Sequence, residues 1–397
     1  MLIASLPPLL HAMSHDTPTM TWDMFCNVID NYGDIGVAWR LARQLSREHG
    51  QRIRLWVDDL TSFARVCPQL NPLTSRQQVQ DIEVCLWSRD FPHDIVPGDV
   101  VLDAFGCTLP DSFLSAMVAR APAVLWINLE YLSAEDWIDC CHGMASPHPR
   151  LPLVRHFFFP GFSEKSGGVI AERGLLEAAA NWRRQTEATQ RYWQDRGVAP
   201  RLPGEYWVSL FAYENQAIGE LLEQWSGGSQ PVRCLVPEGR ILPDITSGFC
   251  QQALAAGDCL ERGALTLQVL PFSDQTDYDR LLWSCDLNFV RGEDSFMRAQ
   301  WAGQPLVWHI YPQEESAHWV KLDAFWQRYG QGLGSDARQA LLALNHAWNH
   351  GQNIGTAWRQ FAHERARLEA HARRWPHTLL AQGDLASRLL RFIAARR

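Results

Sequence analysis

Short hydrophobic runs alternate with helical patterns along most of this 397-residue chain. In the first half, strands are predicted at 22–29, 52–57, 82–87, 100–103 and 123–128. Helical patterns lie between some of these runs, at 36–49 and 112–119. Near-continuous apolar strands that alternate with helices favour a parallel sheet buried on both faces, so the first half predicts a Rossmann-like α/β domain.

The alternation restarts in the second half after a polar break. The stretch 172–196 has a polar helical pattern without a strand, and a linker with two prolines follows at 198–204. Beyond it, strands are predicted at 206–212, 232–236, 265–270, 287–290 and 306–310. The helices predicted between or after these strands cover 215–225, 245–256, 277–284, 295–302 and 316–328. Two arrays of about 180 residues each predict two Rossmann-like domains in tandem.

The last part of the chain is predicted to be helical from 336 to 397, with a break at Pro376. We therefore divide the chain into an extension at 1–20, a first domain at 21–197, a second domain at 205–375 and a final helix at 376–397. We expect the extension to be disordered, because prolines interrupt its short apolar run; a signal peptide is the weaker alternative. In a two-Rossmann architecture such a tail often crosses back, so the final helix is expected to pack on the first domain.

Composition narrows the class of protein. The formal charge of −8, from 36 basic and 44 acidic residues, argues against nucleic acid as a partner, because phosphate binding needs a concentrated basic surface. Runs of 18 apolar residues are missing, so no membrane span is expected. Ten cysteines without a CxxC pair are typical of a reduced cytoplasmic protein. We expect no metal cofactor, because no HExxH motif, Cys/His zinc set or Asp-x-Asp triplet is recognised.

The most informative segment is FCNVIDNYGDIGVAWR at 25–40. A strand is predicted to end at Ile29 and a helix to start near Gly36, which places Asp30 and Asp34 between them. In open α/β sheets, ligands bind outside the carboxyl ends of the strands. Two carboxylates would repel a pyrophosphate there, so the turn suits an acceptor or a catalytic base. The alternative is structural: Asp34 caps the helix, where the macrodipole favours a carboxylate, and Asp30 is a loop acid.

A second acidic turn follows the strand that is predicted to end at Val290. The turn reads Arg-Gly-Glu-Asp-Ser at 291–295, and a helix follows it. Backbone N–H groups at a helix start favour an anion, and Arg291 adds a fixed positive charge. The turn therefore predicts a pyrophosphate site, in which Ser295 caps the helix or donates to a phosphate oxygen. The alternative is an ordinary capped helix.

Aromatic and amide residues follow other strands of the second domain and are expected at the same carboxyl edge of its sheet. They are Phe211, Tyr213, Phe272, Gln275 and Tyr311. Aromatic rings at this edge can stack on a nucleobase, and Gln275 can hydrogen-bond its edge. Each residue taken singly is also explained by packing, and their shared edge is what favours a nucleotide site.

Three motifs resemble the bacterial elongation-factor-P arginine rhamnosyltransferase family (EarP-type). They are FCNVIDNYGDIGVAWRL at 25–41, SLFAYEN at 209–215 and RGEDSF at 291–296. The similarity runs from about Trp22 to the end of the chain. It implies an inverting GT-B glycosyltransferase, in which two Rossmann-like domains face each other across a central cleft. The first domain would bind the acceptor and the second the nucleotide sugar.

The resemblance also implies substrates and site residues. The donor would be dTDP-β-L-rhamnose, and the acceptor one arginine side chain of translation elongation factor P, which the modification activates. The family's essential acids fall on Asp30, Asp34 and Glu293. Its donor-binding residues fall on Phe211, Tyr213, Phe272, Gln275, Arg291, Asp294, Ser295 and Tyr311. No metal, nucleic acid or membrane partner is implied.

The chemistry of an arginine acceptor fits these residue types. A guanidinium, with a pKa above about 12, is a poor nucleophile in water. A carboxylate beside it can orient it and take a proton as the C–N bond forms; we expect Asp30 to be this base, with Asp34 supporting it. Glu293 would steer either the guanidinium or the sugar hydroxyls. The alternatives are a GT-B enzyme with another donor or acceptor, and a non-catalytic module that binds elongation factor P or a nucleotide.

Overall fold

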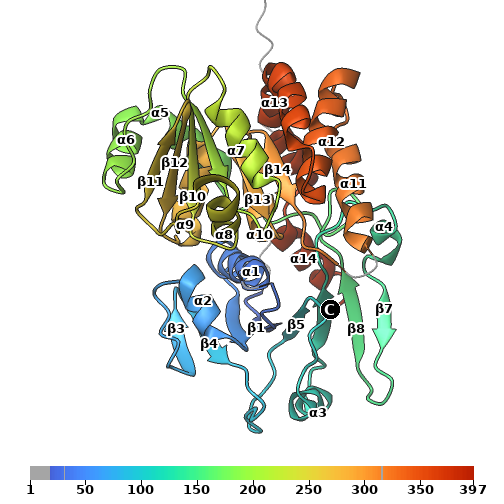
Figure 1. Cartoon of the computed structure of the whole chain (residues 1–397). Helices are drawn as coiled ribbons and strands as arrows, with labels where there is room; N and C mark the ends of the chain where they lie inside the picture. The colour runs from blue at the N-terminus through green and yellow to red at the C-terminus, as the bar shows by residue number, and fades with distance from the viewer. Residues whose placement is uncertain (1–17, 31, 314–315) are drawn as a thin grey trace, which may run out of the picture.

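The computed structural model describes residues 18–30, 32–313 and 316–397, so most of the expected N-terminal extension lies outside the described residues. It has two α/β domains, one above the other in Figure 1, with helix α1 (Gly33–His49) at their junction. Met20 is already buried in the first domain, which therefore begins within the expected extension. Among the described residues, no helix is long and apolar enough to cross a membrane.

The first domain is built on an eight-stranded sheet in the order β3-β4-β2-β1-β5-β6-β8-β7. Its strands are β1 (Thr21–Cys26), β2 (Arg52–Val57), β3 (Arg76–Val79), β4 (Ile82–Leu86), β5 (Val100–Ala104), β6 (Leu125–Leu129), β7 (Ala145–Pro147) and β8 (Val154–Phe158). The central strands run parallel, as the apolar runs predict. β3 and β7 close the two edges as antiparallel partners.

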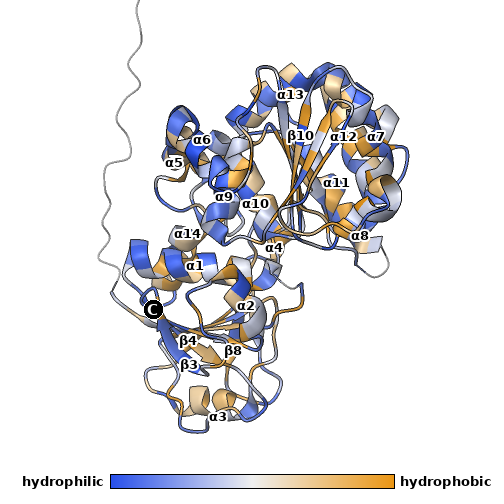
Figure 2. Cartoon of the chain, turned by 60° about the vertical axis from the view of Figure 1, so that its left-hand side comes forward, coloured by the Kyte–Doolittle hydropathy of each residue, from blue (hydrophilic) through white to orange (hydrophobic). Residues whose placement is uncertain are grey.

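Both faces of this sheet are covered. Side chains alternate between the two faces of a strand. Accordingly, Met24 joins one hydrophobic cluster and its neighbour Phe25 joins another. The helices of this domain are α1, α2 (Leu60–Val66), α3 (Asp111–Ala119) and α4 (Ile138–Cys141). Figure 2 shows the hydrophobic strands of both domains between helices that carry their hydrophilic residues outward.

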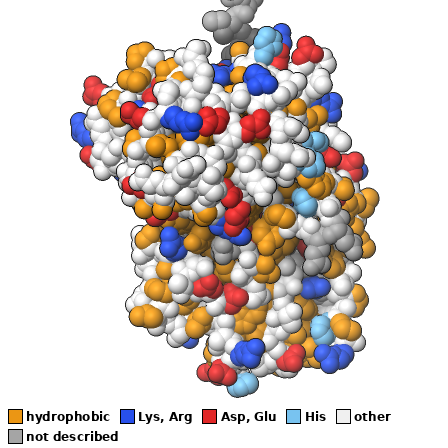
Figure 3. Space-filling view, in the orientation of Figure 1, with side chains coloured by type: hydrophobic (Ala, Val, Ile, Leu, Met, Phe, Trp, Pro, Cys, Tyr) orange, Lys and Arg blue, Asp and Glu red, His pale blue; other side chains and the backbone are white. Residues whose placement is uncertain are grey.

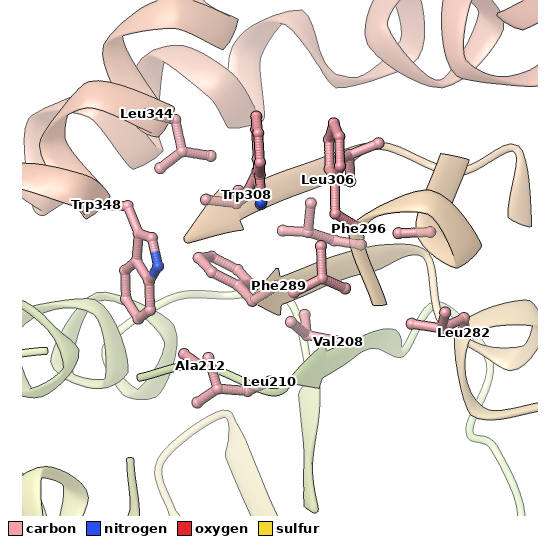
Figure 4. Close-up of a cluster of buried hydrophobic side chains, with 14 of the residues drawn as sticks. Val208, Leu210, Ala212, Leu282, Phe289, Phe296, Leu306, Trp308, Leu344 and Trp348 are labelled. Atoms are coloured by element: carbon pink, nitrogen blue, oxygen red, sulfur yellow. The ribbon is translucent and has the colours of Figure 1, made fainter. Parts of the chain in front are cut away.

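The second domain has a six-stranded sheet in the order β11-β12-β10-β9-β13-β14. Its strands are β9 (Tyr206–Leu210), β10 (Val232–Pro237), β11 (Cys259–Arg262), β12 (Leu265–Leu270), β13 (Leu287–Arg291) and β14 (Leu306–His309). Only β11, at the edge, runs antiparallel to its neighbour. Figure 4 shows part of the core, where Phe289, Phe296, Trp308 and Trp348 pack beside the strands. Its parallel strands were predicted from their apolar runs, but the edge strand β11 was missed.

Two predicted helices of the linker region and second domain need correction. The stretch 172–196 divides at Gln185 into α5 (Leu175–Arg184) and α6 (Thr186–Gln194). The helix predicted at 245–256 is too long, because α8 (Leu242–Ile245) and the π-helical turn that continues it (Thr246–Cys250) stop before Gln251, which has a left-handed backbone. The other helices of this domain are α7 (Ile218–Ser226), α9 (Gln275–Ser284) and α10 (Asp294–Ala302).

The boundary between the domains also differs from the prediction at residue 197. Helices α5 and α6 pack on the second domain, because their indoles bury against it. Trp193 shares a cluster with Trp207 of β9, and Trp182 donates from Nε1 to the hydroxyl of Ser284 at 2.9 Å. In Figure 1 both helices lie beside the second sheet.

The chain after β14 contains four helices, of which the last three form the C-terminal tail. They are α11 (Ala317–Tyr329), α12 (Ser335–His350), α13 (Ile354–Gln382) and α14 (Leu385–Ala394). The predicted break at Pro376 is wrong: this proline lies buried inside α13, and the helix ends at Gln382, just before Gly383. α14 then returns to the first domain, where Leu389 and Ile393 join the cluster that contains Leu41 of α1. Figures 1 and 2 show α14 beside α1.

Candidate active site

The loop between β1 and α1 carries the first pair of acids. β1 ends at Cys26 and α1 begins at Gly33, in each case three residues earlier than predicted. Asp34 therefore lies in the first turn of the helix. Its Oδ2 accepts hydrogen bonds from the backbone N–H groups of Ile29 and Asp30, each at 2.9 Å. The structural alternative expected Asp34 to cap α1, but it does not. Its carboxylate instead fixes the loop that presents Asp30.

Asp34 is almost fully buried, with 3% of its surface exposed. Burial raises its pKa above the ordinary value, and the nearby charge of Asp30 adds to this, whereas the two backbone donors lower it. Hydrogen bonds from the two backbone groups favour the charged form of Asp34 and so oppose the effect of burial.

The two oxygens of Asp30 have different surroundings. The Tyr213 hydroxyl, from the second domain, donates to Oδ2 at 2.6 Å. Burial, and then the charge of Asp30, raise the pKa of Tyr213, so this hydroxyl remains a donor. Among the described residues, the buried Oδ1 has no hydrogen-bond partner. One oxygen of Asp30 is held across the domain junction, and the other is able to accept a proton.

Two glycines leave room for the carboxylate of Asp30 at the domain junction. A Cβ on Gly292 would lie 2.7 Å from Asp30 Oδ2, and a Cβ on Gly33 would lie 2.9 Å from the same atom. Gly292 also has a φ of 62°, a conformation that residues with a side chain rarely adopt. The carboxylate of Asp30 therefore fits only because backbone approaches it from both domains.

Arg291 is the last residue of β13, at the strand end that faces the junction of the two domains. Its guanidinium carbon lies 4.7 Å from the ring centres of both Phe211 and Tyr213, so it is held between two aromatic faces. The side chain is buried, and within the described part of the chain its Nη1 has no hydrogen-bond partner. This is a fixed cation with a free donor, which suits an anionic group.

Ser295 has a different place from the one predicted. Its hydroxyl donates to the backbone oxygen of Arg291 and accepts from the backbone N–H of the same residue at 3.1 Å. The residue at the start of α10 is Glu293, and no side chain caps the helix there. Ser295 thus holds the turn in shape, and the backbone N–H groups at the start of α10 are left for other partners.

Glu293 reaches from the second domain into the first. Its Oε2 accepts a hydrogen bond from the backbone N–H of Leu132 at 2.9 Å. Burial raises the pKa of Glu293 to about 7; Lys321 and the Leu132 N–H oppose this, and the charge of Asp34 adds to it. A carboxyl with such a pKa changes its charge near neutral pH.

The three expected acids line one cavity of about 630 Å³, here called the larger cavity. Its wall comes from both domains and consists of Ile29, Asp30, Gly33, Asp34, Tyr131, Leu132, Gly292, Glu293, Trp308, Ile310, Tyr311, Pro312, Gln313, Ala317 and Lys321. Tyr311 is 41% exposed. Figure 3 shows hydrophobic side chains, with acidic and basic ones among them, where the two domains meet.

A second, narrow cavity of about 60 Å³, here called the smaller cavity, adjoins the first at Asp30 and Gly33. Its remaining lining includes Tyr32, Phe211, Phe272, Gln275, Arg291, Asp294 and Ser295. Phe272 packs on Tyr32 of the first domain, with ring centres 4.7 Å apart, and on the guanidinium of Arg65 at 5.0 Å. Most of the predicted donor residues therefore line the smaller cavity. Tyr311 lines the larger one, and Tyr213, which packs on Tyr311, bonds to Asp30 where the two cavities adjoin.

Gln275 and Asp294 join the two domains in this structure. The amide of Gln275 donates to the backbone oxygen of Gly36 at 3.0 Å and accepts from Arg43 at 2.7 Å. Asp294 accepts from Nε of Arg40 at 2.6 Å. Both side chains line the smaller cavity, yet their polar atoms are engaged by α1.

Sequence reasoning missed Arg40, Tyr131 and Lys321. Arg40 stands inside the first motif, where it was quoted without a role. In the structure it is buried and pairs with three acids, Asp279 at 3.2 Å, Glu172 at 3.5 Å and Asp294. Tyr131 and Lys321 lie in segments without a recognisable motif, so only the fold reveals them.

The expected absence of an Asp-x-Asp triplet is wrong, since Asp-Tyr-Asp stands at 277–279, a spacing typical of a metal-dependent sugar-nucleotide site. Both carboxylates are paired with arginines. Asp277 pairs with Arg196 and Arg280, each at 2.7 Å, and Asp279 with Arg298 at 2.6 Å. Within the described residues, no group of three or more His, Cys, Asp or Glu is placed to hold a metal ion.

Two Rossmann-like domains that meet over carboxylates on one side and an arginine at a strand end on the other define a GT-B glycosyltransferase. A solved structure described as "Structural basis for EarP-mediated arginine glycosylation of translation elongation factor EF-P" matches with a TM-score of 0.68 and 37% identity. The match covers 96% of this chain and 100% of that one.

The model of the family "Elongation-Factor P (EF-P) rhamnosyltransferase EarP" matches residues 22–394, and the chain belongs to this family of glycosyltransferases. A protein-arginine rhamnosyltransferase of Pseudomonas putida is 50% identical over 372 residues, covering 94% of this chain and 98% of that protein. One of Pseudomonas aeruginosa is 48% identical over 374 residues, covering 94% and 99%. The resemblance seen in the sequence motifs is confirmed.

Proposed function

We propose that this protein transfers L-rhamnose from dTDP-β-L-rhamnose to one arginine side chain of translation elongation factor P, with inversion at the anomeric carbon. The position of Asp30 carries this proposal. It lines both cavities, one of its oxygens is held by Tyr213 and the other has no partner among the described residues. A base is needed at the point where an acceptor and a donor sugar meet.

The larger cavity suits the acceptor. A guanidinium entering it would meet the carboxylates of Asp30, Asp34 and Glu293, and guanidinium–carboxylate pairs are strong when partly desolvated. One guanidinium nitrogen forms the bond to C1 while it loses a proton to Oδ1 of Asp30. The product arginine keeps its positive charge, because only one of its protons has been exchanged for the sugar.

The smaller cavity suits the nucleotide diphosphate. Phe272 would stack on the base, Phe211 and Tyr213 would line the sugar-phosphate, and Arg291 would neutralise the departing dTDP with the N–H groups at the start of α10. At about 60 Å³ this cavity is much smaller than ligand sites of roughly 300–1,000 Å³, so the domains must part to admit the donor.

Direct displacement explains inversion. The nitrogen arrives from the larger cavity while the bond from C1 to the diphosphate oxygen breaks toward the smaller one, and the two cavities adjoin at Asp30. Arg291 supplies positive charge for the leaving group. Asp277 and Asp279, the carboxylates of the triplet with metal-binding spacing, are each paired with an arginine. We propose a reaction without a metal ion, in the cytoplasm where the acceptor acts.

The test is intact-mass spectrometry of elongation factor P after incubation with this protein and dTDP-β-L-rhamnose, with and without EDTA. The proposal expects a gain of one deoxyhexose on one arginine in both samples, with an α-linkage by NMR. Transfer from another sugar nucleotide alone would favour the alternative of a different GT-B enzyme. Binding of elongation factor P without a mass change would favour a non-catalytic module.

A further inference from the structure

Lysine is rare in this chain. Of the 36 lysine and arginine residues only two are lysines, Lys165 and Lys321. Lys165 is exposed in the segment after β8. Lys321 comes from α11 and lines the larger cavity together with Glu293 and Tyr131. A chain that places arginine at almost every cationic position therefore has an ammonium group at the proposed acceptor site.

Acidic groups face Lys321 from both domains. Glu293 belongs to the turn before α10, and Glu130 and Glu135 come from the segment after β6. The ammonium lies 5.6 Å from the ring centre of Tyr131. Among the described residues, none forms an ion pair with Lys321 within 4.0 Å. Its charge therefore acts on the acids through space, without the fixed geometry of a close pair.

The charges of Lys321 and Glu293 depend on each other. Burial lowers the pKa of Lys321, and the charges of Glu293, Glu135 and Glu130 oppose this. Burial raises the pKa of Glu293 to about 7, and Lys321 is the first influence against it. The other groups that face Glu293 are the Leu132 N–H, which lowers this pKa, and Asp34 and Asp294, which raise it.

We infer that Lys321 is a positioning residue of the larger cavity, whose ammonium stands in for the acceptor's positive charge beside Glu293 until the guanidinium arrives. The inference rests on the proposed function, because it takes the acceptor to be an arginine. An ammonium is a compact charge on a flexible stem and can withdraw from a carboxylate. A guanidinium in its place would bind Glu293 through two parallel hydrogen bonds and compete with the acceptor.

The first experiment measures the coupling without any turnover. The two lysines are acylated with an amine reagent across roughly pH 6 to 10, the range in which a buried lysine titrates, and quantified by peptide mass spectrometry. Lys165 serves as the internal standard. Glu293→Gln should move the reactivity of Lys321 to lower pH by about one unit and leave Lys165 unchanged. An unchanged Lys321 profile overturns the inference, even if the enzyme is active.

The second experiment follows kcat/KM for elongation factor P against pH. The acidic limb of this pH profile is expected near pH 7, where Glu293 changes its charge. In Lys321→Met the limb should move to higher pH by roughly one unit, which lowers kcat/KM at pH 7 about fivefold. The KM for the donor should stay the same. Lys165→Met, the matched control, should behave like the wild type.

Lys321→Arg separates charge from shape. It should keep the acidic limb in place but raise the KM for elongation factor P, because the guanidinium competes for Glu293. A limb that stays in place in Lys321→Met, with a native circular dichroism spectrum, overturns the inference. Failure of the wild type to transfer a sugar would instead overturn the proposed function, and the acylation experiment would still decide on Lys321.

Discussion

Asp30 and Asp34 stand four residues apart in one loop, yet their carboxylates have different surroundings. Oδ2 of Asp34 is occupied by two backbone donors, whereas Asp30 has one oxygen bound to Tyr213 and one without a partner among the described residues. The sequence motif located both acids but could not assign their tasks, because the donor to Asp30 comes from a residue 183 positions away. The assignment of Asp30 as the base therefore depends on the fold.

Asp30→Asn should abolish most turnover and leave donor binding intact. The amide keeps the shape of the carboxylate and can still accept from Tyr213, but it cannot take the proton of the guanidinium. We expect kcat to fall by about 10²–10⁴-fold, the usual contribution of a general base. The measurements are single-turnover kinetics and calorimetric titration with the donor. Wild-type turnover in this variant would exclude Asp30 as the base.

Phe272→Ala should weaken donor binding by about 1–3 kcal/mol, the range found for a ring that stacks on a nucleobase. Calorimetric titration with dTDP-rhamnose measures the effect directly. Phe272→Tyr is the matched control, because it keeps the ring and should retain nearly all of the affinity. Equal donor affinity in the alanine variant and the wild type would show that the nucleobase of the donor binds elsewhere.

At the scale of elements, predictions succeeded where hydrophobic patterning determines the structure. The buried parallel strands of both sheets were found from their apolar runs alone. β3, β7, β8 and β11 were missed, since each has several polar or partly exposed positions and lacks such a run. Pro376 was taken for a break, although packing inside α13 outweighs its unfavourable effect on the helix. Local rules thus fail where tertiary contacts dominate.

Gly292→Ala tests the turn between β13 and α10. The new Cβ would lie 2.7 Å from Asp30 Oδ2 and 3.2 Å from the Tyr213 hydroxyl, so it must push these two groups apart. We expect a loss of at least about tenfold in kcat, since a displacement of an ångström at a reacting group costs that much or more. Steady-state kinetics with elongation factor P measures it.

Gly50→Ala is the control for backbone strain. Gly50 has a φ of 63°, close to that of Gly292, but a Cβ there meets nothing within 4 Å. Both variants should lose roughly 1–2 kcal/mol of stability through the left-handed backbone, measured by denaturant unfolding. Only Gly292→Ala should lose activity. A similar loss of kcat in both variants would attribute the effect to strain alone.

At the scale of the whole molecule, buried charges join the two domains. Arg40 of α1 pairs with Asp279 and Asp294, which lie 239 and 254 positions further along the chain. Arg298 shares Asp279 and pairs with Glu172. Pairs this distant leave no trace in local sequence patterns, so the cleft was predicted only through the family resemblance. The fold shows that α1 both presents Asp30 and contacts the donor domain.

The pKa of Glu172 determines the pH range in which its ion pairs in this network stabilise the folded protein. Burial alone would raise its pKa, but Arg298 and Arg40 outweigh burial and hold the pKa at about 2, below the ordinary 4.5. A lowered pKa means that the folded state favours the charged form, so this contribution is complete above pH 4.5 and lost as the pH falls toward 2. Glu172 is therefore charged at neutral pH, where the effect of the network on domain closure can be measured.

Arg40→Met should disfavour the closed arrangement of the domains without unfolding either one. Methionine fills a similar space, but Asp279 and Asp294 lose a buried cation, which costs about 3–5 kcal/mol unless the cleft opens and water solvates them. Opening is the cheaper response, because the first sheet has a cluster of its own and only a few first-domain residues, such as Leu132 and Phe162, join the cluster of the second. Small-angle scattering should show a larger radius of gyration, and the KM for the donor should rise. Arg76→Met, which removes an exposed ion pair with Glu83, should change neither. If Arg40→Met also leaves both unchanged, closure depends on the apolar contacts between the domains and not on this network.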